Sequence, residues 1–129
     1  MSFDWSEYLK LAQELAGPSA LHATPEARQR AAISRAYYAA FCKCRNYLRD
    51  EKEHRVPLGG RAHQFVRDEF KRNSDKLYKR IGYNLERLRS DRNKADYDDD
   101  AAVKFDITAQ TDLALAEKVI SLLDLLSRR

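Results

Sequence analysis

Glycine and proline are scarce in this chain: its 129 residues include only four glycines and three prolines. Because these two residue types mark most turns and loops, we expect few loops between long regular elements. The sequence also lacks any apolar run near the roughly 18 residues that a membrane-spanning helix needs, and it lacks a signal peptide. We therefore expect a cytoplasmic protein with no membrane partner.

Cysteine and histidine are too few and too scattered to suggest a metal site. Cys42 and Cys44 are two residues apart, which on a helix places their side chains roughly 200° apart, so they cannot share a metal ion or form a disulfide with each other. The three histidines, at positions 22, 54 and 63, stand alone and fit no metal-ligand spacing. Gly59-Gly60 lacks the lysine and the helix of a phosphate-binding loop. We therefore predict no metal and no cofactor.

Charge is plentiful but unevenly distributed along the chain. Charged residues make up 34% and hydrophobic residues 43%, which is typical of one soluble helical domain, and the formal net charge is +4. Residues 61–94 contain eleven Lys and Arg against five acids, a net of +6, whereas residues 95–129 contain four basic and eight acidic residues, a net of −4. The basic segment suggests a face for a polyanion such as RNA. Solvation of a helical surface is the alternative explanation.

Apolar residues recur every three or four positions along the chain, and no segment alternates as a strand does. The predicted fold class is therefore all-α, a four- to five-helix bundle that forms a single domain over residues 1–129. Glycine and proline place an exposed loop at about residues 51–61. The predicted helices cover residues near 3–16, 25–50, 62–72, 75–95 and 108–127. Hydroxyl side chains that can cap four of these helices are Ser2, Thr24, Ser74 and Thr108.

The stretch from Glu86 to Tyr97 gathers polar side chains at the end of a predicted helix. Arg92 falls beside the apolar stripe of this helix, where a solvated surface arginine is not expected. Arg89, Asn93 and Asp96 lie on the same side, and Arg92 and Asp96 are i,i+4 neighbours. One interpretation is an internal Arg92–Asp96 ion pair that closes the helix end. The other is a polar pocket at a helix–helix or subunit seam that binds a phosphodiester.

Three stretches of the chain together resemble one protein family. The first is Ser34 to Phe41, read SRAYYAAF; the second is Ala62-His63 followed by Phe65 and Phe70; the third is Arg92 to Asp98, read RNKADYD. Their order and spacing, over about residues 5–126, are similar to those of the HEPN superfamily. These are small helical domains of prokaryotic toxin–antitoxin and defence operons.

The resemblance implies a bundle with antiparallel long helices that dimerises through them. In ribonuclease members, an arginine, a polar residue and a histidine from each subunit meet across the dimer and cleave RNA without metal. Carried over, Arg92 would bind phosphate and stabilise the transition state, with Asn93 as the polar residue after it. The slots for the histidine hold Asp96, Tyr97 and Asp98 instead, and His63 is the candidate replacement. For Tyr97 the alternative is an aromatic packed on the bundle at a helix end.

The resemblance and the basic segment together define the functional hypotheses. The first is a toxin–antitoxin or defence component that binds RNA or nucleotide as a homodimer, with weak metal-independent endoribonuclease activity. The alternative is a catalytically inactive helical adaptor, and a nucleotidyltransferase is the expected partner protein. Small residues on the second helix and a broad apolar arc on the last helix also favour a homodimer. The basic residues assigned to RNA binding are Arg87, Arg89 and Lys94.

Overall fold

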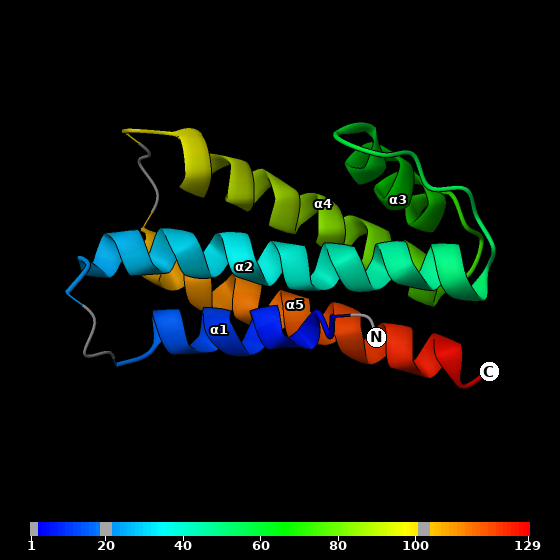
Figure 1. The fold of residues 1–129 in the computed structure, drawn as a ribbon, viewed down its shortest axis with the longest axis horizontal. Helices are drawn as coiled ribbons and strands as arrows, with labels where there is room; N and C mark the ends of the chain where they lie inside the picture. The colour runs from blue at the N-terminus through cyan, green and yellow to red at the C-terminus, as the bar shows by residue number, and fades with distance from the viewer. Residues whose placement is uncertain (1–2, 19–21, 101–103) are drawn as a thin grey trace.

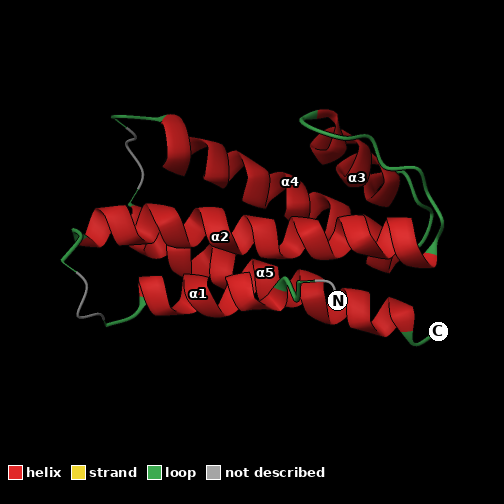
Figure 2. Cartoon of the chain, in the orientation of Figure 1, coloured by secondary structure: helices red, strands yellow, loops and turns green. Residues whose placement is uncertain are grey.

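The computed structural model describes residues 3–18, 22–100 and 104–129, and over these ranges it contains helices and no strand. This confirms the predicted all-α class. The three long helices α2, α4 and α5 run side by side, with α4 antiparallel to both others, and α1 packs along α2 (Figure 1, Figure 2). The elements are α1 (Ser6–Ala16), α2 (Pro25–Asn46), the π-helical turn η1 (Tyr47–Glu51), α3 (Arg61–Lys71), α4 (Lys76–Tyr97) and α5 (Phe105–Ser127).

The start of α2 follows its sequence signal. The Thr24 side chain accepts a hydrogen bond from the backbone N–H of Ala27 at 3.2 Å, and Pro25 occupies the first helical position. The start of α1 differs from the expectation, because the helix begins at Ser6, and the predicted cap Ser2 lies outside the described residues. Asp4 accepts the backbone N–H of Ser6 at 3.0 Å instead.

Two of the predicted caps are wrong. Asp75, not Ser74, caps α4, because its carboxylate accepts the backbone N–H of Leu77 at 2.8 Å. A carboxylate also suits the positive end of a helix dipole better than a hydroxyl does. The last helix begins at Phe105, which places Thr108 inside the first turn. There its hydroxyl donates to the Lys104 carbonyl oxygen at 3.2 Å.

Several element boundaries also differ from the predicted ones. The α-helical part of α2 ends at Asn46, four residues early, and the chain continues as the wider turn η1, which keeps both Tyr47 and Leu48 buried. Helix α4 continues two residues beyond the predicted end, to Tyr97. The irregular loop is shorter than predicted at both ends, because Glu51 belongs to η1 and Arg61 to α3.

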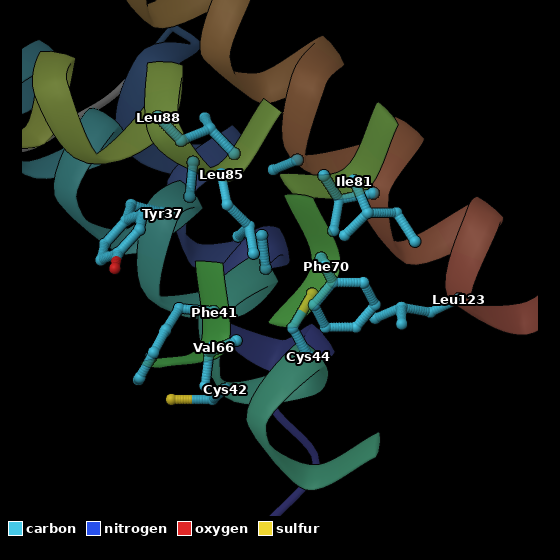
Figure 3. Close-up of a cluster of buried hydrophobic side chains, with 14 of the residues drawn as sticks. Tyr37, Phe41, Cys42, Cys44, Val66, Phe70, Ile81, Leu85, Leu88 and Leu123 are labelled. Atoms are coloured by element: carbon cyan, nitrogen blue, oxygen red, sulfur yellow. The ribbon is translucent and has the colours of Figure 1, made fainter. Parts of the chain in front are cut away.

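The core forms where α2 meets the other helices. Four alanines on α2 have no exposed surface, at positions 32, 36, 39 and 40, so the small residues of this helix are covered by the chain's own α1, α4 and α5. Figure 3 shows a cluster of side chains in this core, in which Phe70 of α3 and Ile81 of α4 lie close to Leu123 of α5. Among the described residues, no helix is long and apolar enough to cross a membrane.

Candidate anion-binding site

The antiparallel packing of α2 and α4 places the SRAYYAAF stretch against the RNKADYD stretch. The Ser34 hydroxyl, buried at 4% exposure, donates to Asp96 Oδ2 at 3.2 Å. Arg35 Nη2 donates in turn to the Ser34 hydroxyl oxygen at 3.2 Å. The Asp96 carboxylate therefore links two arginines on different helices, since it also contacts Arg92.

Arg92 forms the internal ion pair that its spacing predicted. Its Nε lies 2.8 Å from Asp96 Oδ2, and its side chain is only 16% exposed. This approach lacks hydrogen-bond alignment, because the buried Nε–H has no acceptor in the described part of the chain. The two terminal nitrogens donate to Asn93 Oδ1 at 3.0 Å and to the Tyr97 hydroxyl at 3.4 Å. The guanidinium also lies over the Tyr38 ring, 5.2 Å from its centroid.

Tyr97 does not pack on the bundle. Its side chain is 72% exposed, and its ring lies against the Arg92 guanidinium, 5.3 Å from centroid to carbon. The reason is helical geometry: Ala95 takes the buried position in the last turn of α4, so a residue two positions later points roughly 200° away from the core. The packed-aromatic interpretation of Tyr97 is therefore wrong, and the residue belongs to the polar cluster.

A cavity of about 560 Å³ opens beside this cluster. Two further arginines line it, and both are held by aromatic rings: Arg35 lies 4.9 Å from the Tyr8 ring centroid, and Arg45 lies 5.6 Å from the Trp5 ring centroid. Neither arginine has a carboxylate within ion-pair distance over residues 3–18, 22–100 and 104–129. The cavity therefore gathers positive charge that the described chain does not neutralise.

His63, from the first turn of α3, lines the same cavity as Arg92. Its Nδ1 lies 2.5 Å from the Tyr37 hydroxyl, and its ring stacks on Phe41 with centroids 4.3 Å apart. Burial lowers the pKa of His63 to about 4, helped by the positive charges of Arg89 and Arg92. The imidazole is therefore neutral at pH 7.

The remaining predicted residues differ in their distance from the cavity. Arg89 is half-buried, and its positive charge acts on Tyr37 and His63. Its Nε–H has no acceptor among the described residues.

Arg87 does not line the cavity and instead approaches Asp91, with Arg87 Nε 3.5 Å from Asp91 Oδ2. Lys94 is exposed and also lies outside the lining. Asn93 is exposed and contributes through its bond to Arg92.

Sequence reasoning missed the cationic and aromatic side chains that α1 and α2 contribute. The missed residues are Trp5, Tyr8, Ser34, Arg35, Tyr38 and Arg45. A signal was present on α2, because Arg35, Tyr38 and Arg45 are spaced three and seven apart and so share one helix face. The contribution of α1 had no comparable signal, since it depends on how α1 packs against α2.

The fold and site define an all-helical protein with an arginine-rich cavity framed by aromatic rings. No protein-family model matches the chain, and no solved structure matches it. A protein of Methanocaldococcus jannaschii, described as uncharacterized, is 29% identical over 135 residues. This match covers 92% of the present chain and 75% of the archaeal protein.

Proposed function

We propose that this chain is a HEPN-type domain that binds RNA or nucleotide, as a component of a prokaryotic toxin–antitoxin or defence system. The observation that carries the proposal is the convergence of Arg35, Arg45 and Arg92 on one cavity, where a single carboxylate, that of Asp96, pairs with Arg92. Guanidinium groups that are partly removed from water need an anionic partner. A phosphate accepts two parallel N–H bonds from one guanidinium, a geometry that lysine cannot supply.

The surroundings favour a nucleic acid over a simple anion. Aromatic rings interleave with the arginines, and such rings stack on bases in many single-strand binding sites. Tyr97 is 72% exposed at the end of α4, next to Arg92, where a base can reach it. The basic residues Arg87 and Lys94 lie outside the cavity, and an extended RNA strand offers phosphates to both places.

The meeting of the first and third HEPN-like stretches supports the family assignment. The Ser34–Asp96 hydrogen bond joins the two motifs directly, so two stretches far apart in the sequence lie side by side in the fold. On this proposal the chain functions in the cytoplasm as a homodimer, with a nucleotidyltransferase as its partner protein. A helical adaptor without RNA affinity is the alternative that the experiment below distinguishes.

Weak metal-independent endoribonuclease activity is a second candidate. The observation that favours it is that His63 and Arg92 line one cavity, so an imidazole is present although the usual sequence position lacks it. Against efficient catalysis, the pKa of His63 is lowered to about 4, and a general acid–base group works best with a pKa near the working pH. RNA cleavage in the presence of a metal chelator, abolished by His63→Ala, is the result that would support this candidate.

The binding proposal is tested with two substitutions of Arg92. If Arg92 grips a phosphate, Arg92→Lys keeps the charge but loses the paired hydrogen bonds, and affinity for a single-stranded RNA should fall about tenfold. Affinity should also fall steeply with added salt. Lys118→Ala is the matched control, because it removes one positive charge from an exposed position on α5 away from the cavity.

The melting temperature separates binding from structure. If Arg92 serves only its ion pair with Asp96, Arg92→Lys should be mild, whereas Arg92→Ala should lower the melting temperature and leave RNA affinity unchanged. A wild-type protein that binds no RNA would overturn the proposal, and the adaptor would then be the better explanation.

A further inference from the structure

Tyr37 is buried behind the cavity wall, where it forms a short polar contact with the lining residue His63. Tyr37 lies on α2 with 2% of its surface exposed, and its hydroxyl oxygen is 2.5 Å from His63 Nδ1. Tyr37 also lies within the SRAYYAAF stretch. A buried hydroxyl and an imidazole nitrogen at this distance share one proton between them, and its position decides what the opposite side of the imidazole can do.

The acceptors within reach of the Tyr37 hydroxyl indicate the direction of this hydrogen bond. Burial raises the pKa of Tyr37 above its ordinary value, so its O–H is intact at neutral pH and can donate. Its charged neighbours Arg89 and Arg92 offer only donors. Over the described residues, His63 Nδ1 is the one hydrogen-bond partner of the Tyr37 hydroxyl. Donation to Nδ1 is therefore the arrangement that gives this buried O–H an acceptor.

We propose that Tyr37 is a positioning residue that fixes His63 as the tautomer with its proton on Nε2, so that His63 donates a hydrogen bond to an RNA phosphate in the cavity. This inference rests on the proposed function, and it deepens it by assigning the histidine the role of an uncharged donor. Nδ1 is occupied by the tyrosine, and a neutral imidazole then carries its single N–H on Nε2.

The ring that presents this donor is held on three sides. Phe41 stacks on it at 21°, the Tyr37 ring stacks with centroids 5.6 Å apart, and Tyr38 meets it edge-on at 5.9 Å. The charged groups that act on it are Arg89 and Arg92 of α4, and both oppose a positive charge on the imidazole. Packing fixes the plane of the His63 ring, and the hydrogen bond from the Tyr37 hydroxyl selects one of its two tautomers.

The consequence separates binding from general-base catalysis. An imidazole with its proton on Nε2 has no lone pair on that nitrogen and cannot act as a base there, and protonation of Nδ1 would make it a cation beside two arginines. It can donate to a phosphate oxygen, which adds a hydrogen bond to those of the guanidiniums without adding charge. His63 is therefore built to hold a phosphate in place.

Nitrogen NMR of the histidine ring tests the assignment without any ligand. In the wild type at pH 7, His63 should show a protonated Nε2 and an unprotonated Nδ1. Tyr37→Phe keeps the ring packing but removes the donor, and His63 should then populate both tautomers. Tyr38→Phe is the control, because its hydroxyl has no bond to His63, and the tautomer should not change. A wild-type His63 with its proton on Nδ1, or a tautomer unchanged in Tyr37→Phe, would overturn the proposal.

RNA affinity tests the donor role. His63→Gln places an amide N–H near the position of Nε2 and should keep most of the affinity, whereas His63→Leu should lose about fivefold to tenfold. Tyr37→Phe should lose less than His63→Leu, and His22→Leu, at an exposed position outside the cavity lining, should lose nothing. Equal affinity in the wild type and His63→Leu would overturn the donor role. If the wild type itself binds no RNA, the proposed function fails, and the NMR result separately decides whether Tyr37 sets the tautomer.

Discussion

At the scale of single residues, Asp112 is the acidic side chain most remote from water. It lies on α5 with no exposed surface, and neither carboxyl oxygen has a hydrogen-bond partner by strict geometry within the described ranges. Burial raises its pKa to about 8, and the neighbouring Asp91 carboxyl group adds to the effect. Asp112 is therefore mainly protonated at neutral pH. As the pH rises, the buried carboxyl group must either lose its proton or keep it at a cost in folding free energy.

The sign of this effect gives a prediction for stability. The folded pKa of Asp112 lies above the value of 3.8 that an unperturbed aspartate has, so the folded state binds more protons than the unfolded state between pH 4 and pH 8. The free energy of unfolding should fall across that window, by up to about 1.4 kcal/mol per pH unit.

Asp112→Asn removes the titration and keeps the shape. It should raise the melting temperature, and the gain over the wild type should be larger at pH 8 than at pH 5. His63 acts in the opposite direction below pH 6.5, because its lowered pKa makes the folded state bind fewer protons there. That contribution is shared by both proteins and cancels in their difference. A gain that is absent, or constant with pH, would show that Asp112 is not buried as the neutral acid.

At the scale of helices, the crossing of α3 and α4 depends on Gly82. A Cβ atom added at this position would lie 2.6 Å from both the backbone nitrogen and the Cγ of Lys71, so the backbones approach too closely for any side chain. Gly82→Ala should lower the free energy of unfolding by about 1–3 kcal/mol and the melting temperature by several degrees.

Gly60→Ala is the matched control for this substitution. A Cβ at Gly60 meets nothing within 4 Å, and its φ of −63° suits any residue. Its stability should stay within about 1 kcal/mol of the wild type. If Gly82→Ala unfolds no earlier than Gly60→Ala in thermal denaturation, the close crossing does not exist in solution.

At the same scale, features within one helical turn could be predicted from the sequence, whereas contacts between helices could not. The helix-start signal Thr24-Pro25 depends on residues within one turn, and it was predicted correctly. Ser74 and Asp75 are adjacent capping candidates, and only the geometry of the turn determines which of them caps α4. The Arg92–Asp96 pair could be predicted because both residues lie one turn apart on one helix. Its link to Ser34 spans 62 residues of sequence, and the helix period contains no information about that contact.

At the scale of the whole molecule, the features that first suggested a dimer are used inside the chain. The alanines of α2 are covered by neighbouring helices, and most of the broad apolar arc of α5, including Leu122 and Leu126, is buried in the core. Only Ile107 and Leu125 stay exposed among the large apolar residues of α5. Homodimerisation therefore remains a prediction that needs a different surface.

Helix α4 offers that surface. Six of its exposed residues, at positions 80, 83, 87, 90, 94 and 97, are spaced three or four apart and form one stripe along the helix. Tyr83 and Tyr97 are 58% and 72% exposed, and the other positions include Arg80, Arg87 and Lys94. Two copies paired along this stripe would bring like charges together. Arg92 lies roughly 180° around the helix from the stripe, so this pairing leaves the cavity of each chain uncovered.

We therefore predict a dimer through α4 whose stability depends on screening of its basic stripe. Light scattering at micromolar protein should show more dimer when the salt concentration rises from about 0.05 to 0.5 M, because the Debye length shortens about threefold. A short RNA should have the same effect at low salt, since its phosphates neutralise both stripes. Tyr83→Lys should shift the protein toward monomer, because it adds a like charge to a surface that must be desolvated. Leu125→Lys on α5 should leave the dimer unchanged. A monomer at both salt concentrations, with or without RNA, would contradict the dimer, and dissociation by Leu125→Lys but not Tyr83→Lys would move the interface to α5.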